Sequence, residues 1–170
     1  MERPMGDLIV RIESLSRMWI ASVLAHGEQP EAEAWRHLRD WAYSHGLWGD
    51  FVTHPVFGFN NPPPSSGSEE YGYELWIRID GPEAGDGAVT FKEFEGGLFA
   101  VTACKLRSDP DVAKTWRLLW DWAQAGPYRW RRSQELEKVL NPEAAEDELI
   151  LELYLPVESA RNAPSAPKTS

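Results

Sequence analysis

The 170-residue sequence has a single cysteine, Cys104, and four scattered histidines. One cysteine cannot form an intrachain disulfide, and disulfide-free chains are typical of reducing compartments, so we expect a cytoplasmic protein. Metal sites need several ligands at set spacings, and no His-x-x-x-His pair or similar pattern occurs. The P-loop, nucleophile-elbow and dinucleotide fingerprints are also missing. The sequence therefore predicts no metal and no cofactor.

Positive charge and long apolar runs are scarce as well. Lys and Arg number 17 against 27 Asp and Glu, which gives a formal net charge of −10. Nucleic-acid affinity comes mostly from cations that neutralise phosphates, so direct nucleic-acid binding is not expected. An acidic protein instead attracts cationic small molecules. The apolar run at residues 18–24 is too short to cross a bilayer, and no signal peptide is visible.

Tryptophan is abundant, with nine residues, and it marks an internal repeat. Residues 35–42 (WRHLRDWA) return as residues 116–123 (WRLLWDWA), with six of eight positions identical. At about 100° per residue the apolar members of each copy fall on one arc, which predicts an amphipathic helix. A proline lies at the start of each predicted helix and a glycine follows its end, as is typical of helices. We therefore expect helices at about 30–44 and 109–125.

Similar strand-like segments surround each helix. Two segments precede the first helix (8–12 and 18–24) and one follows it (73–79); the second helix has 89–94 and 98–103 before it and 151–157 after it. The second strands align at a shift of 79, the helices at 81 and the closing strands at 78. Each half thus predicts strand, strand, helix, strand.

The first two strands of each half are predicted to form a hairpin, over residues 7–25 in the first half and turning at Gly96 and Gly97 in the second. A short strand is expected within 54–59, and residues 128–140 are predicted to be irregular or to hold a short helix at 133–140. We expect one domain, 1–158, with pseudo-repeats 8–80 and 88–157. Residues 159–170, rich in Ala, Pro and Ser, are expected to form a disordered tail.

This duplicated order resembles the GyrI-like family, the small-molecule-binding domain found alone and attached to AraC-type and MerR-type regulators. Residues 92–101 (KEFEGGLFAV) look like its second-repeat hairpin and residues 116–122 like the start of its helix. Residues 152–157 (ELYLPV) resemble its closing acid-x-Tyr-x-Pro strand, and residues 57–62 and 71–74 resemble a stand-alone subgroup.

The resemblance implies an α+β fold of two SHS2-like ββαβ units. They would form a curved antiparallel sheet with two main helices and a ligand groove where the halves meet. No helix-turn-helix segment flanks the domain here, so a stand-alone member is expected rather than a DNA-binding regulator.

Alternation along the closing strands places Glu74 with Trp76, and Glu152 with Tyr154, on one face. A carboxylate inside an aromatic strand is costly unless it is paired or solvated. If both acids faced water on an open side of the sheet, they would be ordinary surface residues with no role in binding. The resemblance instead implies that Glu152 is the acid that meets cationic ligands, so at least one of the two acids is predicted to lie in the groove.

Flat aromatic walls around a carboxylate favour planar, hydrophobic, often cationic ligands, because ring faces attract cations. This chemistry predicts binding of multidrug or xenobiotic compounds. The predicted ligand-binding residues are Glu152, Tyr154, Glu74, Trp76, Phe57, Trp116 and Trp120, whereas Trp35, Trp41 and Trp122 are predicted to be core.

Two other functions stay open. Some stand-alone GyrI-like proteins resemble hydrolases that open the cyclopropane rings of cytotoxic natural products, and there Glu152 or Glu74 would be catalytic by activating water. The family name also allows a macromolecular partner such as gyrase, although no motif requires one. The same side chains suit binding and hydrolysis, so the sequence does not separate a binding protein from an enzyme.

Overall fold

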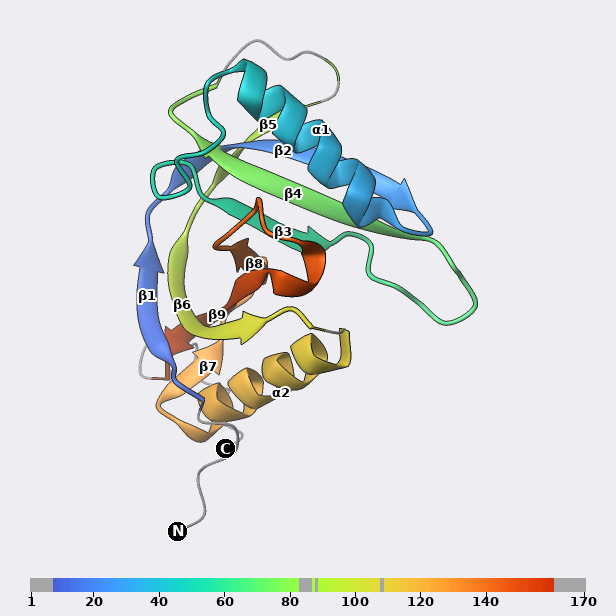
Figure 1. Cartoon of the computed structure of the whole chain (residues 1–170). Helices are drawn as coiled ribbons and strands as arrows, with labels where there is room; N and C mark the ends of the chain where they lie inside the picture. Colours follow the sequence, from blue (N-terminus) through green and yellow to red (C-terminus); the bar gives the residue numbers. More distant parts are fainter. Residues whose placement is uncertain (1–7, 83–86, 88, 108, 161–170) are drawn as a thin grey trace, which may run out of the picture.

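The computed structural model describes residues 8–82, 87, 89–107 and 109–160 (Figure 1). These residues form an antiparallel sheet with two helices, as the duplicated strand-strand-helix-strand pattern predicts. The elements in chain order are β1 (Arg11–Leu15), β2 (Met18–Gly27), α1 (Pro30–Ser44), β3 (Val56–Asn60), β4 (Tyr71–Ile79), β5 (Thr90–Phe94), β6 (Gly97–Lys105), α2 (Asp109–Ala125), β7 (Tyr128–Trp130), β8 (Leu136–Val139), a 3₁₀ turn (Glu146–Glu148) and β9 (Ile150–Ser159).

The sheet has the strand order β1-β6-β9-β8-β3-β4-β2-β5, and β7 pairs with β9. In the middle of this order the two halves meet where β8 pairs with β3. Two short connections, residues 16–17 and 95–96, join strands from opposite ends of this order, so the ends are held near each other and the sheet curls. The predicted α+β fold with a curved antiparallel sheet is therefore confirmed.

The first strand of each half pairs with the other half. β1 pairs with β6, and β5 pairs with β2, so both predicted hairpins are wrong. Gly96 and Gly97 do adopt positive φ values of 78° and 118°. At Gly96, however, a Cβ atom would collide with the backbone of Leu15 and Ser16. The glycine thus lets the two connections pass close together, where a hairpin turn was expected.

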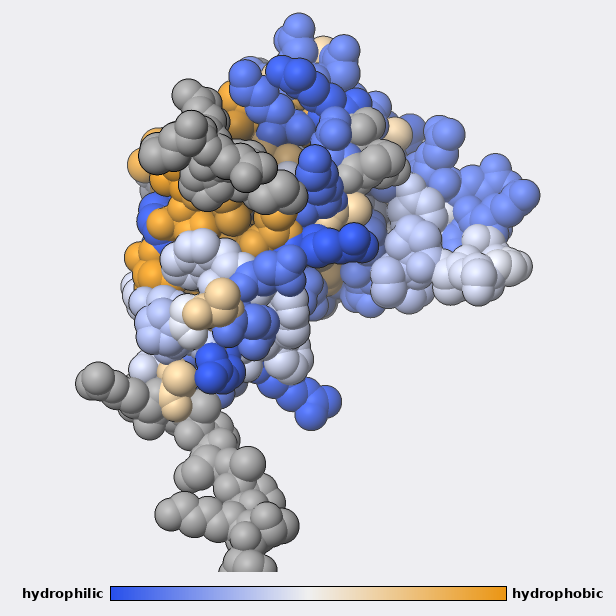
Figure 2. All heavy atoms as spheres, turned by 90° about the horizontal axis from the view of Figure 1, so that it is seen from below, coloured by the Kyte–Doolittle hydropathy of each residue, from blue (hydrophilic) through white to orange (hydrophobic). Residues whose placement is uncertain are grey.

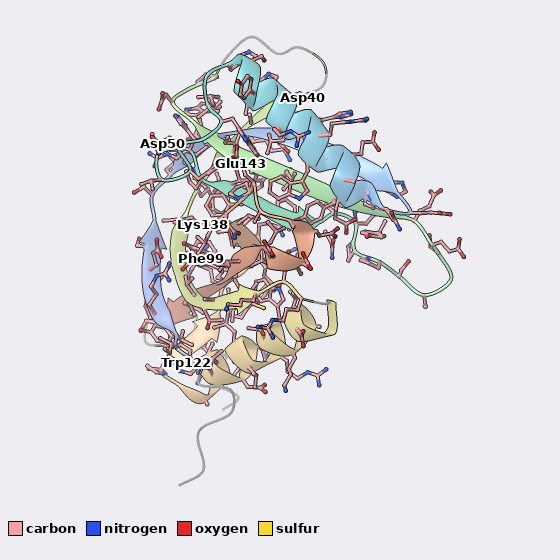
Figure 3. All side chains as sticks on the ribbon, in the orientation of Figure 1. Asp40, Asp50, Phe99, Trp122, Lys138 and Glu143 are labelled. Atoms are coloured by element: carbon pink, nitrogen blue, oxygen red, sulfur yellow. The ribbon has the colours of Figure 1, made fainter. Side chains whose placement is uncertain are left out.

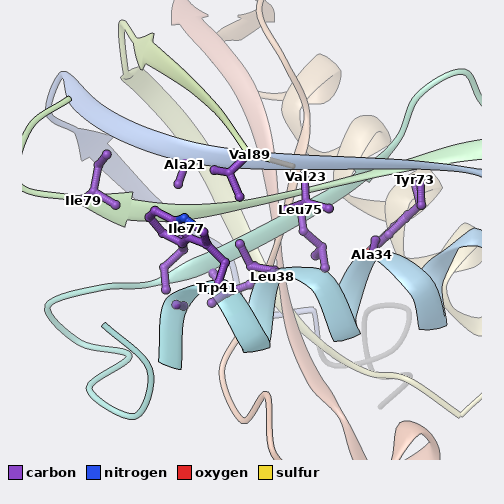
Figure 4. Packing of buried hydrophobic residues seen from close by; sticks show 13 residues of the cluster. Ala21, Val23, Ala34, Leu38, Trp41, Tyr73, Leu75, Ile77, Ile79 and Val89 are labelled. Atoms are coloured by element: carbon purple, nitrogen blue, oxygen red, sulfur yellow. The ribbon is translucent and has the colours of Figure 1, made fainter. Parts of the chain in front are cut away.

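Both helices cover the same face of the sheet. α1 packs on β2 and β4, and α2 packs on β6, β7 and β9. Ala34, Leu38 and Trp41 of α1 point toward β4, where Tyr73, Leu75 and Ile77 face the helix (Figure 4). Of the tryptophans predicted to be core, Trp41 is buried, whereas Trp35 and Trp122 are half-buried against the clusters under the helices.

The opposite face carries a third cluster, to which both halves contribute and which is rich in aromatic rings. Its buried members are Met18, Ile20, Phe57, Phe59, Trp76, Phe94, Phe99, Val101, Leu136 and Tyr154. Neither α1 nor α2 lies over it, and the curl of the sheet encloses these side chains. The predicted alternation of faces along β4 and β9 is confirmed by this separation of the clusters.

Strands β7 and β8 occupy the segment that was predicted to be irregular or helical, so that prediction is wrong. β8 is a central strand between β9 and β3. Leu136 faces the aromatic cluster and Val139 the helix side. Four residues are too few for a periodic signal, which is why the strand was missed. The short strand expected within 54–59 is confirmed as β3.

Some predictions fall partly or wholly outside the described residues. Residues 161–170 of the expected tail are among these, whereas Ser159 ends β9.

In the described part of the chain, neither helix is long and apolar enough to cross a membrane. Seen from below, the surface is largely hydrophilic, with hydrophobic side chains gathered on the left of the view (Figure 2).

Candidate functional site

Glu74 lies on the sheet face away from the helices and is 2% exposed. Its carboxylate accepts hydrogen bonds from Ser22 Oγ (2.7 Å), Trp76 Nε1 (2.6 Å), Asn61 Nδ2 (2.9 Å) and Lys92 Nζ (2.5 Å). Burial alone would raise the pKa of Glu74, but these bonds, led by that from Lys92, hold the pKa below its ordinary value. The acid is therefore ionised and its lone pairs are largely occupied.

Glu152 occupies the equivalent place on β9 and is 9% exposed. Arg11 binds it through both terminal nitrogens, with Nη1 2.6 Å from Oε2 and Nη2 3.0 Å from Oε1. The hydrogen bond with Glu152 is also the main reason that the pKa of Arg11 is raised. Each acid thus meets a cation from the first strand of the other half, since Arg11 lies on β1 and Lys92 on β5.

Neither predicted acid lies in open solvent, and neither has an open carboxylate. The predicted walls Phe57, Trp76 and Tyr154 are at most 5% exposed and pack ring against ring in the third cluster. Burial also raises the pKa of the Tyr154 phenol. A ligand would have to displace Arg11 or Lys92 to reach either acid. Ligand binding by Glu74 and Glu152 stays a prediction.

The helix side of β3 and β8 forms a strip between the two helices, which we call the central strip (Figure 1). Half-buried Glu137 lies in its middle, directly opposite Gly58. Gly58 pairs with Leu75 of β4, and Glu137 pairs with Leu153 of β9. Leu75 and Leu153 correspond at the shift of 78 that relates the closing strands, so Gly58 and Glu137 are equivalent in the repeat. At these equivalent positions in the junction of the halves, the second half therefore has a carboxylate and the first half has a glycine.

Aromatic side chains surround this carboxylate. Trp116 Nε1 donates a hydrogen bond to Glu137 Oε2 at 3.1 Å. The ring of Tyr73 lies over Gly58, where a Cβ atom would collide with its hydroxyl. Burial, with the charge of Glu137 as a smaller cause, raises the pKa of Tyr73 well above its ordinary value. Trp35 packs against both helix-side clusters. Trp35 and Trp116, equivalent in the repeat, thus border one strip from two helices.

The sequence profile described as the GyrI-like small molecule binding domain matches residues 10–158. The chain belongs to the GyrI-like family.

Solved structures agree on the fold. This GyrI-like chain is similar to the EcmrR C-terminal domain, with a TM-score of 0.69, 10% identity, and 90% of this chain and 99% of that chain covered. It is also similar to a hydrolase from Listeria innocua (TM-score 0.64, 15% identity, coverages of 88% and 91%). A third neighbour is SAV2435 bound to tetraphenylphosphonium (TM-score 0.52, 13% identity, coverages of 91% and 97%). A search of curated protein sequences returned no significant match.

In this GyrI-like domain, Trp116 is the one predicted ligand residue at the central strip. Trp120 lies elsewhere on α2, is 41% exposed, and has its ring centre 6.5 Å from that of Trp130 (β7). The sequence pattern did not indicate Glu137 or Tyr73 as candidate site residues, and it predicted that Trp35 is core. The repeat itself could have indicated Trp35, because its equivalent Trp116 was a candidate, whereas Glu137 lies on the unpredicted β8.

The strip combines a carboxylate, a phenol and two indoles, which suits a ligand with a flat ring and a positive charge. Figure 3 labels Lys138, the residue after Glu137, near the centre of the sheet between the helices. Within the described residues, no group of three or more His, Cys, Asp or Glu side chains could hold a metal ion.

Proposed function

We propose that this GyrI-like domain binds planar, hydrophobic, cationic small molecules at the central strip, with Glu137 as their charge partner. The observation that carries the proposal is the half-buried carboxylate of Glu137 at the junction of the halves, beside Trp116 and Trp35. A partly desolvated acid attracts a cation more strongly than an exposed one. Such binding fits the family's small-molecule role. A protein that binds such compounds broadly would serve in xenobiotic resistance.

The hydrogen bond from Trp116 to Glu137 can be exchanged for a contact between Glu137 and a ligand. In the free protein the indole N–H partners the Glu137 carboxylate, so the acid is not left unpaired. A bound cation takes over that role, and the released indole can then pack against the ligand ring. Stacking of this kind depends little on the exact ligand, so we expect broad selectivity.

Calorimetric titration with N-methylacridinium, a planar permanent cation, tests this proposal. We expect Glu137→Gln to weaken binding about 10- to 100-fold, or about 1.4–2.8 kcal/mol. Trp116→Phe should weaken it less, because a ring face remains. Glu152→Gln and Glu74→Gln test the sequence-based assignment, and Glu146→Gln, at an exposed acid of the same charge, is the control. If Glu152→Gln abolishes binding and Glu137→Gln does not, the site lies on the other face.

A hydrolase is the second candidate, and the nearness of a carboxylate to a phenol at the strip favours it. Glu137 would take a proton from water as the oxygen attacks a cyclopropane carbon, and the opened ring carbon would gain a proton, so that one water is added in all. Incubation with a cyclopropane-containing alkylator, followed by mass spectrometry, should then show a gain of one water. The reaction should be lost in Glu137→Gln and slowed in Tyr73→Phe, whereas binding without this product supports a binding protein.

A further inference from the structure

An open depression lies beside α1, next to the central strip. Its volume is about 390 Å³, within the range of about 300–1,000 Å³ for small-molecule sites. Arg39, Asp40 and Tyr43 line it from α1, Trp48 from the loop that follows, and Glu143 from the segment before β9. Both halves therefore contribute, and Figure 3 labels Asp40 and Glu143 in the same part of the molecule.

Two aromatic side chains form its apolar walls. Tyr43 is 75% exposed, and Trp48 is half-buried against Phe51, whose ring centre is 5.0 Å away. Trp48 also meets Trp35 edge to face, at 6.5 Å between ring centres. The depression thus adjoins the side chains of the central strip but shares no lining residue with them.

The charges in the depression favour a cation. Asp40 and Glu143 supply two carboxylates, and Arg39 is the single lining cation, with its Nε 4.0 Å from Asp40 Oδ1. Trp48 Nε1 donates to Glu143 Oε1 at 3.0 Å, and among the described residues Glu143 has no other hydrogen bond. Its second oxygen can therefore accept a bond from a ligand.

The second half provides an internal comparison. The residues equivalent to Arg39, Asp40 and Tyr43 at a shift of 81 are Trp120, Asp121 and Gln124. There β7 follows the helix and covers it, and Trp130 packs on Trp120. In the first half the structure describes no strand between α1 and β3. α2 packs with Gln124 at the position equivalent to Tyr43, so packing of this helix does not require an aromatic ring there. The fold therefore does not explain the exposed ring of Tyr43.

We propose that this depression is a second binding site, for small aromatic cations, in which the rings of Tyr43 and Trp48 stack on the ligand and Asp40 and Glu143 bind its charge. The proposal rests on the proposed function for the class of ligand but uses none of the central-strip residues. Because the depression is open, we expect it to bind more weakly than the central strip.

Calorimetry and Trp fluorescence with N-methylacridinium test the second site. The wild-type protein should show two classes of site, and Tyr43→Ala or Glu143→Gln should weaken only the weaker class, by at least tenfold. Val52→Ala, at a residue 91% exposed and outside the depression, and Glu146→Gln are the controls. Circular dichroism checks that each variant is folded.

The two sites give separable outcomes. If Tyr43→Ala and Glu143→Gln bind as the wild type does, the second site is overturned, whatever Glu137→Gln shows. If Glu137→Gln keeps wild-type binding while Tyr43→Ala loses one class of site, the second site stands and the central-strip proposal fails. A single class of site in the wild type that Tyr43→Ala leaves unchanged also overturns the second site.

Discussion

At the scale of single residues, the surroundings of an acid decide what it can do. Glu74 and Glu137 both lie within strands, yet Glu74 accepts four hydrogen bonds from protein donors, one of them from a cation. Glu137 is half-buried next to an indole donor. Glu74 therefore suits a structural role, whereas the proposed role of Glu137 needs its carboxylate to bond a cation in place of the Trp116 indole.

The lowered pKa of Glu74 links stability to pH. The folded state binds its proton less readily than the unfolded chain, so the stabilisation is complete above the ordinary pKa of 4.5 and is lost as pH falls below it. We expect the free energy of unfolding of the wild type to fall more steeply than that of Glu74→Gln between pH 5 and 3, by at most about 1.4 kcal/mol per pH unit. Urea titrations measure both slopes, with exposed Glu69→Gln as control; equal slopes would contradict the assignment.

Gly58 and Tyr73 make a coupled pair. A methyl group at Gly58 would collide with the Tyr73 ring and hydroxyl and press on Leu75, so we expect Gly58→Ala to destabilise the protein by about 1–3 kcal/mol. Adding Tyr73→Phe removes the hydroxyl and should recover part of the loss. Thermal melts of the two single variants and the double variant measure the coupling. Strictly additive losses would mean that the two side chains do not meet.

At the scale of elements, β1 and β5 join the two halves, because each of them pairs with a strand of the other half. Arg11 and Lys92 each carry a cation to an acid in the opposite half. The two buried acids are costly when unpaired, so these ion pairs favour the exchanged strand pairing over the two local hairpins.

Removing Arg11 tests this role. Arg11→Met leaves Glu152 buried without its cation, and we expect a loss of about 2 kcal/mol, below the range for fully buried pairs because Arg11 is half exposed. Hydrogen exchange should show faster opening of β1 and of the β6 amides bonded to it. The double variant Arg11→Met, Glu152→Leu should regain much of the stability, and exposed Arg36→Met should change little. Unchanged exchange in β1 would count against the ion-pair lock.

The helices and most strands were predictable, because residues 35–42 and 116–123 repeat and the flanking segments alternate. Strand partners were not predictable, since alternation shows that a segment is extended but not which strand lies beside it. The site was only partly predictable for the same reason. The acids at 74 and 152 follow from periodicity, whereas Glu137 becomes visible once β8 lies beside β3.

At the scale of the whole molecule, the exchanged strands make one cooperative unit of two similar halves. We expect a single unfolding transition, with the same midpoint by far-UV circular dichroism and by Trp fluorescence, because neither half keeps its full sheet without the other. Tryptophans in both halves report on the change. Two separate transitions would mean that the halves fold independently.

The central claim is that the Glu137 carboxylate, at the junction of these halves, selects ligands by charge. The most direct measurement compares N-methylacridinium with neutral acridine at pH 8, in the wild type and in Glu137→Gln. We predict that the wild type binds the cation at least tenfold more tightly than acridine and that Glu137→Gln binds the two about equally. If the variant keeps the full preference for the cation, Glu137 is not the charge partner and the account is contradicted.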